Sequence, residues 1–181
     1  MILGLDISTT CIGYSLFSED GDLLKIGCVK MRPKQTIFEK LKHFEEHMEE
    51  ISTMNVTHVS IEEPLKKFAG KFSSATTIAL LNFFNGMISA VCYRTWGVEP
   101  VYYNVNSARK TAYPHVKFGR KSSEGKTQVW EEVSKLEPHL NWKYGPRSRK
   151  LVDENFDMCD AYTVGLCHLI TLEKQAALLK D

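Results

Sequence analysis

The sequence predicts an α/β domain built on a mixed five-stranded sheet, and two observations carry this prediction. Five short apolar runs have strand character, and the first three follow one another with only tight connections. The last two are each preceded by a longer stretch of helical periodicity. Strands joined by tight turns pair antiparallel, and strands joined through helices pair parallel. We therefore expect an antiparallel three-strand meander plus two parallel strands, flanked by helices.

The length and composition fit one domain over residues 1–181. The chain has 181 residues, of which 43% are hydrophobic and 25% are charged, so a disordered, collagen-like or disulfide-scaffold chain is excluded. No apolar run approaches the roughly 18 residues that span a bilayer, and the N-terminus lacks the basic region of a signal peptide. We expect an intracellular protein that is not secreted and has no membrane partner. Its five cysteines are expected to be reduced core thiols.

The meander is expected over residues 1–7, 11–18 and 23–29. The first run, MILGLDI, is apolar and carries Asp6 at its carboxyl end. The stretch SEDGD between the second and third runs contains an Asp-Gly pair, which suits the positive φ angles of a tight hairpin turn.

Helices and strands alternate in the rest of the chain. Apolar residues recur in steps of four and three from Gln35 to Met54, which predicts an amphipathic helix. Residues 57–63 return to strand character, and Pro64 ends this strand because proline cannot donate to the ladder. A helix with a broad apolar surface is expected over 74–94, then a short strand over 100–105 and a long closing helix over 156–179.

A basic segment precedes the closing helix. From Arg109 to Lys150 there are 11 Lys and Arg against 4 Glu, a balance of +7 in a chain whose net charge is +1. Such a segment indicates a polyanion-binding face, with a solvated basic surface as the alternative. We expect a short helix around 127–136 and an exposed loop over 141–150, with Trp130 and Trp142 as packing residues.

Acidic residues stand at three places where an apolar element fixes them. Asp6 ends the first strand, Glu62 ends the fourth, and Asp157 and Asp160 share one face of the first turn of the closing helix. Singly, each fits a structural role at a strand end, at a solvated edge or at a helix N-terminus. Together they predict a cleft in which carboxylates need compensating cations. Oxygen ligands in this number suit two Mg²⁺ ions, with Mn²⁺ as a substitute, and such a pair hydrolyses phosphodiesters.

Glu63 is a rival to Glu62 for the place in this cleft. Strand alternation puts Ile61 and Glu63 on one face and Glu62 on the other. Because Val59 and Ile61 form the core-facing set, Glu62 is the acid expected to point to the cleft.

Four segments resemble the motifs of the RuvC-type Holliday junction resolvases, which belong to the ribonuclease H-like superfamily. ILGLDISTTCIGYSLF resembles the first motif, in which an acid and a later glycine are here Asp6 and Gly13. VSIEEP resembles the second motif, whose strand ends in the catalytic Glu, here Glu62. EGKTQV is similar to the Lys-x-Gln-Val segment, with Lys126 near the active site, and FDMCDAYTVGL resembles the Asp-x-x-Asp-Ala motif of the closing helix. The segments occur in the family's order and cover nearly the whole chain.

The resemblance implies a ribonuclease H-like fold and a metal-dependent endonuclease that resolves four-way DNA junctions by paired nicks in recombination and repair. The implied catalytic residues are Asp6, Glu62, Asp157, Asp160 and Lys126, of which the four acids hold the metal ions, and no small-molecule cofactor is needed. Two like strands must be cut, so we expect a homodimer. The helix at 74–94 is its candidate interface, with burial of that helix wholly within the monomer as the alternative. The protein is expected in the cytoplasm, in the nucleoid or in the DNA-containing compartment of a host cell.

DNA contacts are predicted from two basic clusters, one of which carries aromatic residues that suit base stacking. The predicted DNA-binding residues are Lys66, Lys67, Phe68, Lys71, Lys110, Lys117, Arg120 and Lys121. Bacterial members carry a Phe soon after the catalytic Glu, where Leu65 stands here. This departure, and the more basic segment 113–125, favour a viral, phage or organellar branch, or a broader branched-DNA nuclease, and leave the preferred DNA sequence open.

Three other functions compete with this one. GLDISTT is also similar to the first phosphate motif of sugar kinases and actin-like ATPases, but the second phosphate loop of those proteins is missing from the sequence. A ribonuclease H acting on RNA–DNA hybrids and a non-catalytic junction-binding protein remain open. Cleavage of a four-way junction against a hybrid duplex separates them.

Overall fold

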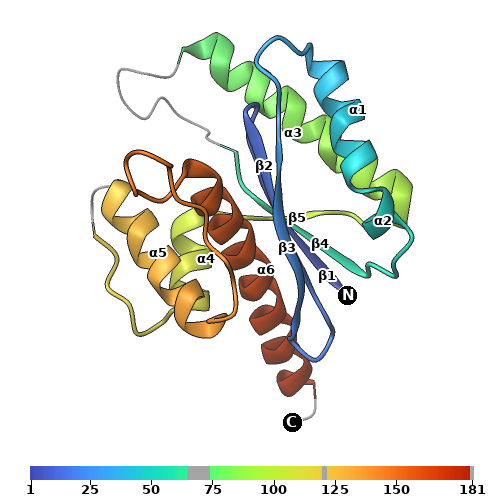
Figure 1. The fold of residues 1–181 in the computed structure, drawn as a ribbon. Coiled ribbons are helices and arrows are strands. Elements are labelled where there is room, and N and C mark those ends of the chain that lie inside the picture. The colour runs from blue at the N-terminus through green and yellow to red at the C-terminus, as the bar shows by residue number, and fades with distance from the viewer. Residues whose placement is uncertain (65–73, 120–121, 180–181) are drawn as a thin grey trace.

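The computed structural model describes residues 1–64, 74–119 and 122–179. Its centre is a five-stranded sheet in the order β3-β2-β1-β4-β5 (Figure 1). The first three strands pair antiparallel, and β4 and β5 continue the sheet parallel to β1. The predicted mixed sheet is therefore confirmed. The strands are β1 (Ile2–Ile7), β2 (Cys11–Phe17), β3 (Leu23–Lys30), β4 (His58–Glu62) and β5 (Val101–Tyr103).

Helices cover both faces of the sheet (Figure 1). One face packs against α1 (Ile37–His47) and α3 (Ala75–Trp96), with the short α2 (Glu49–Ser52) beside them. The other face packs against α6 (Asp153–Leu178), and α4 (Val105–Ala112) and α5 (Ser122–Leu136) lie against α6.

Several helix boundaries differ from the sequence prediction. The helix expected from Gln35 to Met54 begins only at Ile37, because Thr36 caps it with Glu39, and it breaks at Met48 into α1 and α2. Helix α4 lies outside the predicted elements, because its eight residues include one buried side chain and so carry little periodicity. Helix α5 begins five residues before its predicted start, and α6 begins three residues before its predicted start.

The strand residues divide between two cores. Leu3, Leu5 and Ile7 of β1 belong to the apolar core shared with α1 and α3. The alternate residues of β1 face α6, because successive side chains of a strand point to opposite faces. Asp6 belongs to this second set, so the alternation directs its carboxyl group towards α6.

Helix α3 differs from the other helices because much of its surface is apolar and uncovered. Phe84 and Ile88 are buried against the sheet, whereas Leu80, Phe83 and Tyr93 are 44%, 52% and 60% exposed. By length and composition this helix is apolar enough to cross a membrane, which the sequence analysis did not expect of any segment. Its buried side packs against the sheet, and its exposed apolar side is typical of a surface that binds another molecule.

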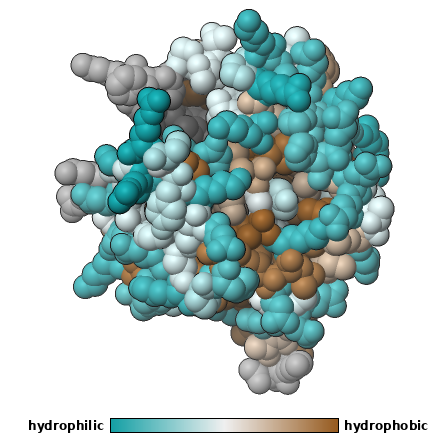
Figure 2. All heavy atoms as spheres, in the orientation of Figure 1, coloured by the Kyte–Doolittle hydropathy of each residue, from teal (hydrophilic) through white to brown (hydrophobic). Residues whose placement is uncertain are grey.

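The surface seen from the β3 side is mostly hydrophilic, with apolar side chains gathered near its middle, where β3 crosses the molecule (Figure 2). Strand β3 is an edge strand of the sheet, and its Leu24 is 49% exposed. All five cysteines are free thiols; four are buried, as expected of core thiols, whereas Cys28 is partly exposed.

Glycines on the two central strands let α6 lie directly on the sheet. A Cβ atom at Gly4 would stand 2.4 Å from the carbonyl oxygen of Ala161, and one at Gly13 would stand 2.1 Å from the carbonyl oxygen of Asp157. Both contacts are with helix backbone, which cannot rotate away as a side chain can. The position of α6, and of the acids on it, therefore depends on these glycines.

We expect Gly13→Ala to lower the free energy of unfolding by about 2 kcal/mol or more, because the new methyl group must push α6 off the sheet. Gly27→Ala is the matched control on the neighbouring strand, where the added Cβ meets only the movable end of the Tyr14 side chain. We expect it to change the free energy of unfolding by less than about 1 kcal/mol. Urea unfolding of both variants measures the difference, and equal effects would contradict the role given to Gly13.

Candidate active site

One cavity of about 360 Å³ lies where the carboxyl ends of β1 and β4 meet α4, α5 and α6. The structure brings together at this cavity the five residues that the sequence analysis assigned to catalysis. Its lining includes Asp6, Glu62, Asp157, Asp160 and Lys126.

Strand pairing and helix periodicity explain this convergence. Leu5 of β1 pairs with Ile61 of the parallel β4, so the next residues, Asp6 and Glu62, stand side by side on the α6 face. Asp157 and Asp160 are three residues apart and share one face of α6. Since α6 begins at Asp153, the two aspartates lie in its second turn and not in the first turn, where the sequence analysis expected them.

Two basic side chains reach the cavity from α4 and α5. Arg109 Nη2 lies 3.0 Å from Asp160 Oδ1, and this pair is almost fully buried. Lys126 Nζ lies 3.9 Å from Asp160 Oδ2 and 6.0 Å from the ring centre of Phe156. Asp160 therefore has a cation beside each of its carboxylate oxygens.

Arg109 is the site residue that the sequence analysis did not single out. Its guanidinium lies 5.8 Å from the ring centre of Phe118, and a Cβ atom on Gly125 would stand 2.9 Å from its Nη1 atom. The ring and the bare glycine backbone thus hold Arg109 against Asp160. The sequence signal for Arg109 is the cap residue Asn104, which marks the start of a helix. In that helix, α4, Arg109 points inward and Lys110 is exposed.

Asp6, Glu62 and Asp157 hold protons more tightly than free carboxyl groups. Burial raises the pKa of Asp6 well above its ordinary value, and the neighbouring acids raise it further. Burial and Asp160 raise the pKa of Glu62 to about 8, against partial compensation by Arg109 and Lys126. Burial also raises the pKa of Asp157. The two bases therefore neutralise the cluster only in part, and it calls for further positive charge.

This donor set fits Mg²⁺ or Mn²⁺ in its chemistry, since every candidate ligand is a carboxylate oxygen and the cluster is short of positive charge. Within residues 1–64, 74–119 and 122–179, no three His, Cys, Asp or Glu side chains are arranged closely enough to hold an ion as they stand. Asp160 is bound by Arg109 instead. Side-chain rotation would have to accompany metal binding.

Glu62 and Glu63 both line the cavity, but in different ways. Glu62 interacts electrostatically with Asp157 and Asp160. Glu63 lies beyond the end of β4, and its backbone N–H donates to the Tyr103 carbonyl at 2.8 Å. The geometry favours Glu62 as the member of the acidic cluster, in agreement with the strand alternation.

The predicted DNA-binding residues are only partly described. Lys110 on α4 and Lys117 are exposed and do not line the cavity. The others lie outside the described residues: Lys66, Lys67, Phe68, Lys71, Arg120 and Lys121. Trp130 and Trp142 pack edge to face with ring centres 6.3 Å apart, so their assignment as packing residues is confirmed.

The raised pKa of Glu62 predicts a pH-dependent stability. A carboxyl whose pKa is higher in the folded chain stabilises the fold fully below the unfolded value, and this contribution is lost as the pH rises through the folded value. With a chelator present, we expect Glu62→Gln to raise the Tm above pH 8 and to leave it near the wild-type value around pH 4.5. The expected gain is about 1–2 kcal/mol, or roughly 2–8 °C.

Glu99→Gln is the matched control, because Glu99 is exposed and lies away from the cavity. Its Tm difference from the wild type is expected to stay flat over the same pH range. A Glu62→Gln difference that does not vary with pH would contradict the electrostatic description of the cluster.

Comparison with solved structures gives matches over nearly the whole chain. RuvC of Thermus thermophilus, solved with a Holliday junction substrate, matches with a TM-score of 0.67 and 14% identity over 96% of this chain and 94% of that one. Fowlpox virus resolvase, solved with Holliday junction DNA, matches with a TM-score of 0.58 and 15% identity over 94% and 97% of the two chains. The yeast mitochondrial Holliday junction resolvase Ydc2 matches with a TM-score of 0.60 and 12% identity over 93% and 77%.

No protein-family model and no curated protein sequence matches the chain. At identities of 12–16% the structural likeness concerns the fold. These neighbours are ribonuclease H-like junction resolvases from a bacterium, a virus and a mitochondrion, and the predicted fold class is confirmed. The chain has the ribonuclease H-like fold in the form found in Holliday junction resolvases.

Proposed function

We propose that this protein is a metal-dependent, structure-selective DNA endonuclease that resolves four-way junctions by paired nicks. The observation that carries the proposal is the convergence in one cavity of two bases with the four acids of the cluster, which are Asp6, Glu62, Asp157 and Asp160. The cavity lies at the carboxyl ends of neighbouring parallel strands, where open α/β sheets commonly bind ligands. The shared fold of the junction resolvases supports the choice of branched DNA as substrate. Such a protein would act in DNA recombination and repair, in an intracellular compartment that contains DNA.

The residues of the cavity have separate roles in this proposal. Asp6, Glu62, Asp157 and Asp160 would hold two Mg²⁺ ions, which supply Lewis-acid stabilisation and an activated water for attack on phosphorus. Asp6 and Glu62, on adjacent strands, fix one side of the ion site, and α6 carries the other side. No covalent link between protein and DNA is required.

Lys126 and Arg109 would act on the phosphate. Both now neutralise Asp160, so an ion that binds Asp160 frees their charge for the substrate. Lys126 is 39% exposed and can turn to the phosphate undergoing cleavage, where its charge offsets the charge that develops in the transition state. Arg109 is 11% exposed and stays beside the ion site.

DNA would approach over the basic segment next to the cavity. Lys110 and Lys117 are exposed and offer charge to phosphates on either side of the cut. The remaining predicted contacts, including Lys66 and Phe68, are proposed from the sequence alone.

A dimer would provide the two active sites that paired nicks require. The surface of α3 is the proposed interface, because Leu80 and Phe83 are large apolar side chains that are 44% and 52% exposed. They lie three residues apart on one helix face, so burying them against a second copy covers both at once. Closed two-fold assemblies match the approximate two-fold symmetry of a four-way junction.

The central prediction concerns the acid on β1. Asp6→Asn removes one charge from the cluster and keeps the size of the side chain, so we expect junction cleavage to fall at least about 10²-fold. Junction binding is expected to persist, since phosphate contacts elsewhere supply most of the affinity. A synthetic four-way junction with Mg²⁺ is the substrate, and gel shifts in Ca²⁺ or chelator measure binding.

Asp20→Asn, an exposed aspartate in the turn between β2 and β3, is the matched control and is expected to cleave normally. Normal cleavage by a folded Asp6→Asn protein would refute the assignment of the cavity. Cleavage of an RNA–DNA hybrid in preference to the junction would instead favour a ribonuclease H.

The dimer prediction is tested by placing a charge on α3. We expect the wild type to sediment as a dimer at micromolar concentration and Phe83→Glu to sediment as a monomer, because a buried carboxylate disfavours an apolar interface. Leu24→Glu on β3 is the control, since it also replaces a large, exposed apolar side chain with a carboxylate. We expect this variant to remain a dimer. A wild-type monomer that still makes paired symmetric nicks would overturn the model.

A further inference from the structure

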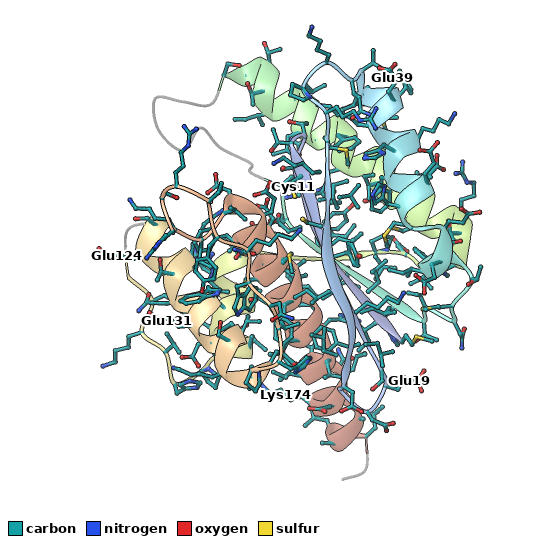
Figure 3. The ribbon with its side chains drawn as sticks, viewed as in Figure 1. Cys11, Glu19, Glu39, Glu124, Glu131 and Lys174 are labelled. Atoms are coloured by element: carbon teal, nitrogen blue, oxygen red, sulfur yellow. The ribbon has the colours of Figure 1, made fainter. Side chains whose placement is uncertain are left out.

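A pair of cysteines lies next to Asp157 of the acidic cluster. Cys11, which is labelled in Figure 3, begins β2, and Cys28 lies on the paired strand β3. The register pairs Cys11 with Lys30 and Gly13 with Cys28, so the two cysteines are diagonal neighbours on one face of the sheet. The thiol of Cys11 is in hydrogen-bonding contact with both the sulfur of Cys28 and the carboxylate of Asp157.

This pair differs from the other three cysteines of the chain. Cys92, Cys159 and Cys167 are buried, each without a second cysteine among the groups that act on it. Cys28 is partly exposed, and an open pocket bordered by Lys30, Glu154 and Asp157 reaches Cys11. A small oxidant therefore has a route to the pair and not to the core thiols.

The surroundings of Cys28 favour its reactive form. The hydrogen bond from Cys11 lowers the pKa of Cys28 to about 7, and the charge of Lys143 acts in the same direction. A partly exposed thiol near a cation, with a second thiol in contact, is the arrangement of redox-active cysteines.

We propose that Cys11 and Cys28 form a reversible redox site, at which hydrogen peroxide oxidises the two thiols to an intramolecular disulfide that displaces Asp157. The sulfur of Cys28 attacks the peroxide, the O–O bond breaks, and a sulfenic acid and one water form. The sulfur of Cys11 then attacks the sulfenic sulfur, the S–O bond breaks, and the oxygen leaves as a second water with the proton of Cys11. Two electrons pass from the thiols to the peroxide, and a dithiol reductant reverses the change.

The geometry links this bond to the cavity. Diagonal neighbours in an antiparallel sheet are about 7–8 Å apart, whereas the Cα atoms of a disulfide are usually about 4.4–6.8 Å apart, so the strands must shift for the bond to close. Gly13 lies opposite Cys28, and its Cα atom supports the backbone of Asp157. The shift therefore acts on Asp157, which at the same time loses its hydrogen bond with the Cys11 thiol.

The loss of nuclease activity on oxidation rests on the proposed function, but the formation of the disulfide does not. The full chain is treated with hydrogen peroxide, digested without reduction and examined by mass spectrometry. We expect a peptide that links Cys11 to Cys28, lighter than the two separate peptides by two hydrogen atoms. Absence of this peptide in the oxidised protein would overturn the redox site, whatever the protein does to DNA.

Junction cleavage is measured on the same samples. We expect peroxide to lower it by about tenfold or more and dithiothreitol to restore it, as for the loss of a group that orients a ligand. Cys28→Ser, with Cys28→Ala as a second variant, is expected to resist peroxide, and Cys167→Ser is expected to respond like the wild type. A linked peptide with unchanged cleavage, or equal inactivation of the Cys28 variants, would overturn the coupling to Asp157. A reduced protein that cuts no junction would refute the proposed function and leave the peptide result standing.

Discussion

The backbone of α6 touches the two central strands of the sheet, and the arrangement of the acidic residues depends on that contact. Gly4 and Gly13 leave no side chain between the strands and the helix, so the carbonyl oxygens of Ala161 and Asp157 lie where Cβ atoms would otherwise be. With the helix at this depth, Asp157 and Asp160 are brought to Asp6 and Glu62. A larger residue at either glycine would lift the helix and open the cluster, with no change in any of the four acids.

The same closeness gives the cluster its electrostatic character. Buried carboxylates that face one another cannot all be ionised without added positive charge, and the raised pKa values of Asp6 and Glu62 express this. Arg109 compensates in part through its ion pair with Asp160. Holding these acids together therefore lowers the free energy of unfolding at neutral pH, and a cation bound by the folded protein would raise it again. Such a cost at the end of a central sheet is typical of a working site.

The sequence was sufficient for the parts of the fold that have strong periodicity. The meander, β4, α3 and the closing helix could be predicted because apolar residues recur with the period of each element. Helix α4 could not, since eight residues with one buried side chain leave no repeating pattern. The same reason hid Arg109, which reaches the site only because α4 turns it inward. The acids were predictable from strand ends and from helix spacing, whereas their pairing with Arg109 depends on contacts between distant segments.

The acidic and the basic side chains of the cavity stand on different layers of the fold. The acids stand on two central strands and on the helix packed directly against them. The basic side chains stand on α4 and α5, which lie against α6 on the side away from the sheet. Substitutions in that outer layer change the surface offered to a ligand and leave the sheet and its acids in place. The surface offered to a ligand can therefore change independently of the acids, within a fold that this chain shares with bacterial, viral and mitochondrial proteins to which it is only 12–16% identical.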